Sequence, residues 1–422
     1  MIKRFNLLAL TLGLILMAPS ILIAEDILIQ VYLFRGTWME GQPGLKQVEF
    51  LLAAANPEIS SIMAKVANSE AVLRAVDQTV IENPAKPLSG NAGRVVTLKE
   101  EVRIEDTGGG FFFKNPYAIR VSPKGDIFIK DGQQQALQFD SRGRFVRNLF
   151  KKGQGPGELT SILDIWASRD RLFLLGDHPK ILVYDHDGNL VKELSLRDLG
   201  RAQFVQADTG SLLIKKSGWP DPSAGVGLRD IPQDIIEIAP DGTTAKSIGS
   251  FPIRGFVQVY KGGATGMTTW NQLQAVSLDG NTLFLNHTPE YLVETFVRDK
   301  GVVVRRFKRP YSRVKRSGGG VSEPGGPEPP PPKFQPDIYA LHVVDGKLWV
   351  QTSTVVGGKG ILFDVFDTEG RYLDNFFVHF LKKDPSNNLA NPRLTIADGF
   401  AYFTDKTEGE LLVVKKCRLV GF

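Results

Sequence analysis

Short segments in which apolar and polar residues alternate recur from residue 113 to the end of the chain. One unit, residues 115–149, reads NPYAIRVSPKGDIFIKDGQQQALQFDSRGRFVRNL and divides into four strands joined by short polar turns. Its second strand has six versions along the chain: DIFIKD (126–131), RLFLLGD (171–177), SLLIKKS (211–217), NTLFLNH (281–287), KLWVQTS (347–353) and FAYFTDK (400–406). The closing hairpin has five: FDSRGRFV, YDHDGNLV, IAPDGTTA, VRDKGVVV and FDTEGRYL, each with a glycine in its turn.

Repeated four-stranded units of about 40–50 residues are typical of β-propeller blades. The last unit ends after ELLVVKK (410–416) and lacks a fourth strand, whereas the β-rich segment RVVTLKEEVRIE (94–105) belongs to no unit. If these two segments pair, the N-terminal one completes the sixth blade and removes an exposed edge. The sequence therefore predicts an all-β, six-bladed β-propeller over residues 94–422, closed by an N-terminal strand.

A different pattern precedes the propeller. Residues 27–34 (ILIQVYLF) read as a strand, and apolar residues at helical spacing follow from Val48. Asn56-Pro57 marks a helix start, and the last helical face extends to Val80 before Asn83-Pro84 ends it. We therefore expect residues 25–93 to form a small α/β segment of one strand and two or three helices.

The N-terminus, MIKRFNLLALTLGLILMAPSILIAED, places two cations before an apolar run that is followed by small residues. This layout predicts a signal peptide over residues 1–24, cleaved after Ala24 or Ser20. An uncleaved membrane anchor is the alternative, because the apolar run is nearly long enough to span a bilayer. Cleavage would leave a protein with no stable membrane insertion, in the bacterial periplasm or secreted.

The stretch GQGPGEL (153–159) resembles a phosphate-binding loop, but the pattern is incomplete. Its spacing is G-x-G-x-G, no Lys-Ser or Lys-Thr follows, and Pro156 removes one backbone N–H. We therefore interpret it as the turn that joins the first and second blades.

The arrangement NPYAIRV…GDIFIKD…ALQFDSRGRFVRNLFKKGQGPGEL resembles the bacterial six-bladed β-propeller proteins related to NHL-repeat proteins. A repeat of the form P-x-x-I-x-V-x-x-x-G-x-I-x-V-x-D is common in that group, and GxGPGE often follows the first repeat. The resemblance covers roughly residues 94–422 and is strongest at 115–159, whereas units three to five lack the aspartate after the second strand. It implies the fold and says little about function, because many members are uncharacterised exported proteins.

Composition and charge exclude some classes of partner. The formal net charge of +5 includes Lys3 and Arg4, and the +3 that remains is too small to indicate nucleic-acid binding. Basic residues cluster at 305–316, which we interpret as a solvated linker. The Pro/Gly-rich insert RSGGGVSEPGGPEPPPPKFQP (316–336) is expected to be an exposed linker between blades four and five.

The sequence contains no complete catalytic motif. There is no G-x-S-x-G elbow, and the five histidines show neither H-x-x-x-H nor H-E-x-x-H spacing. We expect His178 and His186 in surface turns, and the lone Cys417 as a buried or edge thiol. Asp131, Asp177 and Asp405 recur after second strands, which favours a structural role in the adjoining turns.

The central funnel is the usual binding place of a propeller, and it is lined by the starts of the first strands. Polar residues predicted there are Asn115, Asp164, Gln203, Asn271, Asp337 and Asn391. Such oxygen-rich positions suit calcium, so we treat calcium as a possible ligand and expect no other cofactor. Trp219 and Trp270 lie in long connections, where aromatic residues can line a binding surface.

These patterns give two hypotheses for function. The first is an exported, non-catalytic propeller that binds a protein or glycan in the bacterial cell envelope. The alternative is a metal-dependent hydrolase or lactonase that uses the funnel, as in some six-bladed lactone hydrolases. The complete fold signal beside the absent catalytic motif favours the first hypothesis.

Overall fold

The computed structural model describes residues 80–422, together with four short strands before residue 36. Within 80–422 the description leaves out residues 107, 109, 133, 178–179, 197–200, 209, 220–224, 240, 243–244, 260–264, 317–331 and 381–393. The chain separates into two compact units, residues 1–67 and 68–422.

In the first unit, β2 (Ser20–Ala24) pairs antiparallel with β3 (Ile27–Val31), and β1 (Ile15–Leu16) pairs with β4 (Phe34–Arg35). The strand predicted over 27–34 corresponds to β3. The predicted helices between residues 48 and 79, and most of the predicted signal peptide, lie outside the described residues.

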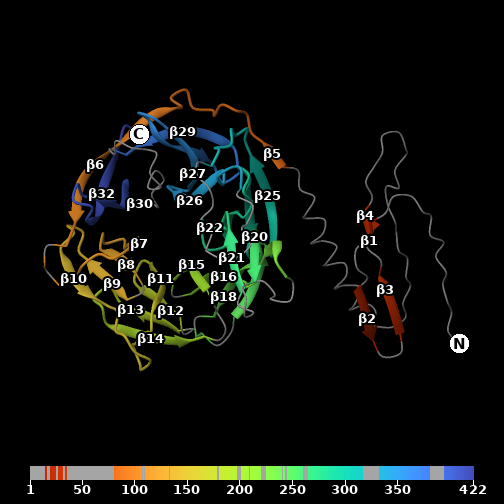
Figure 1. Ribbon diagram of the computed structural model, residues 1–422, viewed down its shortest axis with the longest axis horizontal. Helices are drawn as coiled ribbons and strands as arrows, with labels where there is room; N and C mark the ends of the chain where they lie inside the picture. Colours follow the sequence, from red (N-terminus) through yellow and green to blue (C-terminus); the bar gives the residue numbers. More distant parts are fainter. Residues whose placement is uncertain are drawn as a thin grey trace. The chain divides into compact units, whose positions relative to one another are not determined.

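The second unit is built from antiparallel sheets arranged around a common centre (Figure 1). Blade one contains β7 (Pro116–Val121), β8 (Ile127–Asp131), β9 (Gln135–Phe139) and β10 (Phe145–Asn148), and blade two contains β11 (Ile162–Ala167), β12 (Leu172–Gly176), β13 (Lys180–Tyr184) and β14 (Leu190–Ser195). Blade three contains β15 (Arg201–Ala207), β16 (Leu212–Ser217), β18 (Gln233–Ile238) and β19 (Ala245–Ser250).

The remaining blades follow the same order from centre to rim. Blade four contains β22 (Gln274–Ser277), β23 (Thr282–Asn286), β24 (Val293–Val297) and β25 (Val302–Lys308), and blade five contains β26 (Ile338–Val344), β27 (Lys347–Val356), β28 (Gly360–Phe366) and β29 (Tyr372–His379). Blade six contains β30 (Thr395–Ala397), β31 (Phe400–Lys406) and β32 (Leu412–Val420). All six predicted second strands are the second strands of these blades.

The fourth strand of blade six comes from the other end of the propeller sequence. Strand β6 (Arg94–Ile104) pairs antiparallel with β32 from Thr97 to Ile104, which confirms the predicted pairing of these segments. Its first residues, Arg94–Thr97, also pair in parallel with β29 of blade five. One strand therefore joins the outer edges of two blades.

The core is divided among the blade interfaces. Six hydrophobic clusters lie between successive blades, and each draws residues from two neighbours. The cluster between blades six and one packs Tyr402 and Val414 against Ile127 and Phe139, with Ile104 of β6 among them. Burying a side chain of this size stabilises the fold by about 1.5–3 kcal/mol, so each interface contributes substantially to the free energy of unfolding.

The segment before β6 also lies along the rim. Strand β5 (Val80–Glu82) pairs in parallel with β25 of blade four, although the sequence predicted a helix through Val80 and placed residues 80–93 in the α/β segment. The outer edge of β25 offers unpaired backbone groups, and pairing with them outweighs the weak helical pattern at this point. Residues 80–104, here called the strap, thus run past blades four, five and six.

The basic cluster at 305–316 is not the solvated linker that we predicted. Its residues lie on β25 and in the segment after it, where they form ion pairs: Arg305 with Glu369, Arg306 with Glu294, Lys308 with Glu82, Arg309 with Asp364 and Arg313 with Asp337. Asp364 is fully buried and also accepts hydrogen bonds from the hydroxyls of Tyr291 and Tyr372. The acidic partners are distant in sequence, so the local charge run gave no sign of them.

The stretch GQGPGEL forms the turn between β10 and β11, as predicted. The backbone N–H of Gly155 donates to Glu158 Oε2 at 2.9 Å, and that of Gly157 donates to Glu193 Oε2 at 2.8 Å. Gly157 has a φ of +72°, a conformation that glycine adopts without strain. Because carboxylates of the chain itself occupy these N–H groups, the turn is not a phosphate cradle.

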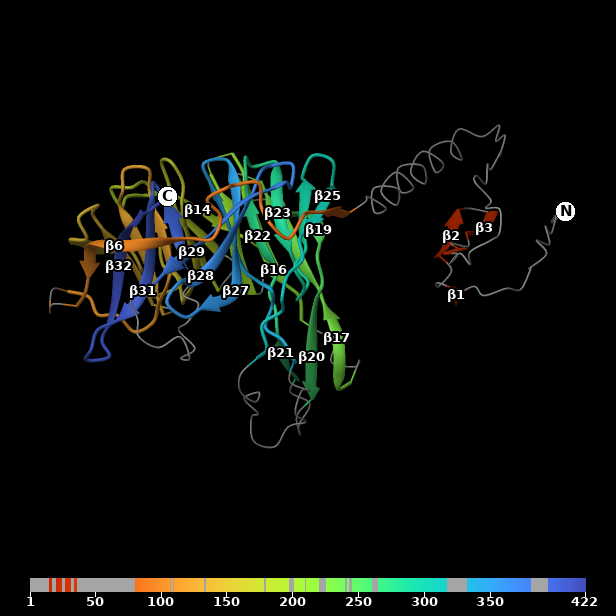
Figure 2. The same cartoon turned by 90° about the horizontal axis from the view of Figure 1, so that it is seen from above.

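A small accessory sheet projects from one face of the disc (Figure 2). It consists of β17 (Gly227–Ile231), β20 (Ile253–Val259) and β21 (Thr265–Thr269), which are inserted among the strands of blades three and four. The flanks of the insert at 316–336 are joined by a backbone hydrogen bond from Gln335 to Val314. The rest of that insert, residues 317–331, lies outside the described residues.

Replacing Asn83 tests whether the strap stabilises the propeller. Its side-chain amide donates to the carbonyls of Lys308 (3.2 Å) and Gly370 (2.9 Å), and its oxygen accepts the N–H of Tyr372 at 2.8 Å. Asn83→Ala leaves these buried groups unpaired, so we expect the free energy of unfolding in urea to fall by about 1–3 kcal/mol. The control Asn91→Ala, at an exposed position of the same segment, should change it by less than about 0.5 kcal/mol. Equal effects of the two substitutions would show that the strap contributes nothing specific.

Candidate functional site

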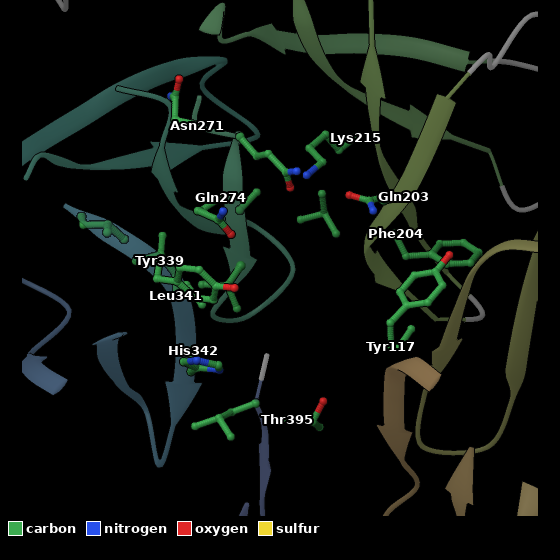
Figure 3. Close-up of a pocket in the computed structure, with 18 of the residues that line it drawn as sticks. Tyr117, Gln203, Phe204, Lys215, Asn271, Gln274, Tyr339, Leu341, His342 and Thr395 are labelled. Carbon is green, nitrogen blue, oxygen red and sulfur yellow. The ribbon is translucent and has the colours of Figure 1, made fainter. Parts of the chain in front are cut away.

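The inner strands surround a central cavity of about 860 Å³. Tyr339, Leu341 and His342 of β26 lie on one side of it, and Tyr117 and Gln203 lie on the other (Figure 3). Lys215 and Gln203, which are paired residues on neighbouring strands, extend into the same part of the cavity. The volume is in the upper part of the range for small-molecule sites in proteins.

The wall combines aromatic rings with amides. The aromatic residues are Tyr117, Trp166, Phe204, Trp270 and Tyr339. The amide residues are Gln203, Asn271, Gln272, Gln274 and Gln335. Trp270 follows directly after β21 and lines the cavity, so the accessory sheet adjoins it. The expectation that this residue lines a binding surface stays a prediction.

Irregular pairing decides which inner-strand residues face the cavity. The register of the inner strand shifts in four blades: between Pro116 and Ala118 in β7, Ile162 and Asp164 in β11, Phe204 and Gln206 in β15, and Ile338 and Ala340 in β26. A β-bulge adds one residue and turns the following side chains to the other face. Simple alternation along these strands therefore does not give the lining residues.

Asp164 is buried in the wall, with 5% of its surface exposed. Its two carboxylate oxygens accept the backbone N–H groups of Ile165 and Phe204, each at 2.9 Å. Arg120 approaches this carboxylate at 3.7 Å and also lies 5.2 Å from the ring centre of Trp166. Asp164 thus connects blades one, two and three and positions the guanidinium of Arg120.

A buried lysine supports the wall from behind. Lys130 of β8 is fully buried, and its ammonium donates to the hydroxyl of Tyr117 and, at 2.5 Å, to the carbonyl of Gly132. Burial lowers the pKa of Lys130 to about 8, and the nearby Asp164 and Asp131 partly oppose this shift. Tyr117 is therefore held in place by a hydrogen bond from a group that does not itself line the cavity.

Three of the six predicted funnel residues line the cavity: Asp164, Gln203 and Asn271. Gln203 is half-buried, whereas the amide of Asn271 is buried and donates to the carbonyl of His287 at 2.7 Å. The side chain of Gln203 extends into the cavity, as we predicted for a funnel residue (Figure 3).

Asn115 and Asp337 do not line the cavity, and Asn391 lies outside the described residues. Asn115 is exposed, and its backbone N–H donates to Asp131. Asp337 is buried against Arg313 at 3.0 Å and accepts the N–H of Tyr291, also at 3.0 Å. Asp337 thus pairs with ionic and backbone groups between strands, whereas Asn115 is an exposed residue held through its backbone.

The cavity residues do not fit a calcium ion. Calcium takes six to eight oxygen ligands, several of them carboxylates, whereas Asp164 is the one carboxylate among the described lining residues. Both of its oxygens already accept backbone N–H groups. Among the described residues, no group of three His, Cys, Asp or Glu side chains is arranged to hold a metal ion.

The three recurring aspartates and Cys417 have structural roles and do not line the cavity. Asp131 accepts the backbone N–H of Lys114 at 2.8 Å, and Asp177 accepts that of Ser161 at 3.2 Å. The role of both aspartates is structural, as predicted, but the backbone that they bind here precedes the first strand of the blade. Asp405 accepts the backbone N–H of Lys406 at 2.8 Å and also pairs with Lys415 at 2.9 Å. Burial raises the pKa of the Cys417 thiol to about 11, which makes it a poor nucleophile.

His186 lies in a turn, as predicted, but the prediction that it is at the surface is wrong. The residue is buried. Its carbonyl accepts a hydrogen bond from the side-chain amide of Gln138 at 2.8 Å, and its ring packs against Phe128 of the neighbouring blade. His178 lies outside the described residues.

His342 gives a pH-dependent prediction. Its ring lines the cavity, Nε2 lies 3.3 Å from Gln351 Oε1, and burial lowers its pKa to about 4. In the unfolded chain a histidine has a pKa near 6.5, so the unfolded state binds a proton more readily. The stability due to neutral His342 is thus complete above about pH 6.5 and decreases as the pH falls toward 4. We expect His342→Gln to lose less unfolding free energy than the wild type between pH 7 and pH 5; parallel losses would contradict this assignment.

Comparison with known proteins gives one family match. The family model DUF5128, described as a 6-bladed β-propeller, matches residues 106–223. No curated protein sequence matches the chain.

The solved structures that match the chain share little sequence with it. A protein of Bacteroides fragilis, described as exported, is 13% identical with a TM-score of 0.48 and covers 81% of this chain and 100% of its own. BamB from Moraxella catarrhalis is 9% identical with a TM-score of 0.35 and covers 79% and 96%. The β-propeller domain of Cps50 (Swd1) from Myceliophteria thermophila is 11% identical with a TM-score of 0.35 and covers 76% and 99%.

The relation to NHL-repeat proteins stays a prediction, since the family model does not test it. The blade order and the family match over residues 106–223 agree on the architecture, a six-bladed β-propeller.

Proposed function

We propose that the chain is an exported, non-catalytic β-propeller that binds a glycan in the bacterial cell envelope through its central cavity. The sequence left a protein or a glycan open as partner. The observation that favours the glycan is the wall of the cavity, which contains both aromatic rings and amide side chains.

This wall suits the chemistry of sugars. The C–H faces of a pyranose ring are apolar and pack against flat aromatic rings, whereas its hydroxyls both donate and accept hydrogen bonds. Glutamine and asparagine amides also carry both a donor and an acceptor, so they match hydroxyls without a change of protonation. Gln203, Gln274 and Tyr339 extend toward the space between the blades (Figure 3).

Export rests on the N-terminal sequence. The two cations, the apolar run and the small residues before Glu25 form the pattern of a signal peptide. Among the described residues, no helix is long and apolar enough to cross a membrane.

The alternative function, a metal-dependent hydrolase or lactonase, has no observation in its favour. Such an enzyme needs a metal held by several side chains or an activated nucleophile. The single carboxylate of the described wall, Asp164, is already occupied by backbone N–H groups. Stoichiometric calcium or zinc in the purified protein, together with turnover of lactones, would support the alternative.

Two aromatic substitutions test the proposal. Trp270 and Tyr339 are half-buried residues of the cavity wall, so Trp270→Ala and Tyr339→Ala should remove stacking surface for a sugar ring. We expect each to weaken binding to an array of envelope-derived oligosaccharides roughly threefold to tenfold. Phe112→Ala is the matched control, because Phe112 is 49% exposed and does not line the cavity.

The outcomes separate the possibilities. Loss of binding in the two cavity variants and none in the control would support a glycan site. If no oligosaccharide binds the wild type, or if all three variants bind as well as it does, the proposal is wrong. Each variant should first be shown to unfold cooperatively, so that a binding defect is not mistaken for a folding defect.

A further inference from the structure

His287 joins three parts of the fold where blades three and four meet. It directly follows β23, and its ring nitrogen Nδ1 lies 2.8 Å from the carbonyl oxygen of Pro252. Pro252 is the residue before β20, the first strand of the hairpin that β20 forms with β21 in the accessory sheet. The backbone carbonyl of His287 also accepts the side-chain amide of Asn271, two residues after β21, at 2.7 Å. His287 therefore contacts both connections that join this hairpin to the blades.

The second ring nitrogen of His287 faces blade four. Nε2 lies 3.4 Å from Oε2 of Glu294, a residue of β24 with 5% of its surface exposed. A backbone carbonyl only accepts hydrogen bonds, and so does an ionised carboxylate. A neutral imidazole carries one N–H, so it would turn a lone pair toward one of these two oxygens, whereas the protonated ring donates to both. The geometry around His287 therefore fits the protonated ring.

The charges near His287 agree with this geometry. Burial by itself lowers the pKa of His287, but the hydrogen bonds to Glu294 and to the Pro252 carbonyl, together with the negative charge of Glu294, outweigh it. The positive charge of Arg306, which pairs with Glu294 at 2.7 Å, acts in the opposite direction. The net result is a pKa of His287 above its ordinary value of 6.5.

Charged groups on the other elements around His287 have partners of their own. They are Arg254 of β20, paired with Asp230 at 2.8 Å, Glu290, paired with Arg313 at 3.2 Å, and Lys215 of β16, which donates to the carbonyl of Leu273 at 2.9 Å. The connections that flank the ring contribute the ring of Phe251 and two uncharged hydrogen-bond partners. Glu294 and Arg306 are therefore the charged groups that set the protonation of His287.

The hairpin that His287 holds carries part of the cavity wall. Trp270 lies between β21 and Asn271, and both residues line the cavity. Asn271 is buried beside the cavity (Figure 3). Because a ligand binds only those molecules in which the wall is in place, loosening of this connection lowers the apparent affinity by the fraction of molecules affected.

We propose that His287 is a positioning residue for the cavity wall. Its protonated ring joins the Pro252 carbonyl to Glu294 and so fixes the accessory hairpin, which ends beside Trp270, against blade four. When the ring loses its proton, one of the two hydrogen bonds is lost and the hairpin opens more often. The last step, that a glycan then binds more weakly, rests on the proposed function of the cavity.

Hydrogen exchange without any ligand tests the first step. His287→Gln keeps one N–H donor group but has no titrating proton. Because the folded-state pKa of His287 is above 6.5, the stabilisation by its second hydrogen bond is complete below about pH 6.5 and is lost as the pH rises through the folded-state pKa.

We expect the amides of β20 and β21 to exchange about threefold to tenfold more slowly in the wild type than in His287→Gln at about pH 6. The ratio of the two rates should fall toward one as the pH rises to about 8.5. This ratio removes the intrinsic pH dependence of exchange. It also removes the titration of Lys130, whose pKa of about 8 is common to both proteins.

Binding of neutral oligosaccharides from the envelope-derived array tests the second step. Their charge does not change over this pH range, so a pH effect belongs to the protein. We expect the wild type to bind about threefold to tenfold more tightly than His287→Gln at about pH 6, and the two affinities to approach each other at about pH 8.5. The histidine of the wall, His342, stays neutral here because burial lowers its pKa to about 4. The control His379→Gln makes the same chemical change on β29, outside the cavity, and should keep the wild-type pH profile.

A measurement on the wild type alone decides the question if His287→Gln folds poorly. Nitrogen NMR of the imidazole rings distinguishes a ring with two N–H groups from a neutral one. The signal of His287, identified through its contact with the ring of Phe251, should show two N–H groups at about pH 6 and lose one above about pH 6.5. A titration midpoint at or below about pH 6.5 would overturn the proposal.

The outcomes separate this inference from the proposed glycan function. Exchange ratios that do not change with pH would overturn the positioning role of His287, whether or not a glycan binds. Exchange ratios that fall with rising pH, in a protein that binds no oligosaccharide, would support the positioning role and overturn the glycan function. If exchange changes with pH as expected while the affinity does not, the hairpin does not control the ligand site, and the link between the two steps is wrong.

Discussion

The pairing of β6 with β32 joins two distant parts of the propeller sequence in one sheet, and we expect the arrangement of the ring to depend on it. Each blade packs only on its two neighbours, so the stability of the ring is a sum of nearest-neighbour interfaces. The interface between blades six and one contains Ile104 of β6 beside Tyr402 and Val414. Removing β6 would take a strand from that sheet and apolar surface from that core at once.

The central cavity follows from the same constraint. Its walls are inner strands of different blades. Asp164, which belongs to the second blade, contacts residues of the first and third blades. Residues that face each other across the cavity are therefore held at fixed separations only while the blades stay in a ring. The long strap over blades four to six adds a second set of contacts at the rim, away from the cavity.

Most of the fold could be predicted from the repeat pattern of the sequence. The alternation and the glycine turns located the second strand of each blade, and the surplus strand at 94–105 indicated its partner. The strand at 80–82 was missed because three residues carry too little pattern, and its pairing depends on a free edge more than two hundred residues later. The partners of Arg309 and Arg313 were missed for the same reason, since Asp364 and Asp337 are close only in the folded chain.

Less of the site could be predicted. Gln203 was found from its position at a strand start, but Arg120, Lys215, Tyr339 and His342 were not. The β-bulges in four inner strands change which side chains face the cavity, and no residue type in the sequence marks them. Lys215 lies on a second strand, so a search confined to first strands missed it. The aromatic residue of a long connection, Trp270, could be found because such residues often line binding surfaces.

Thermal unfolding of two shortened chains tests the role of β6 most directly. A chain that begins at residue 80 retains the strap, and we expect it to unfold in one cooperative transition. A chain that begins at residue 107 lacks β5 and β6, leaves the edge of β32 unpaired, and should unfold at a much lower temperature or aggregate through that edge. A third chain, beginning at residue 94, keeps β6 without β5 and should resemble the first more closely than the second. Equal, cooperative unfolding of the chains that begin at 80 and at 107 would contradict the account.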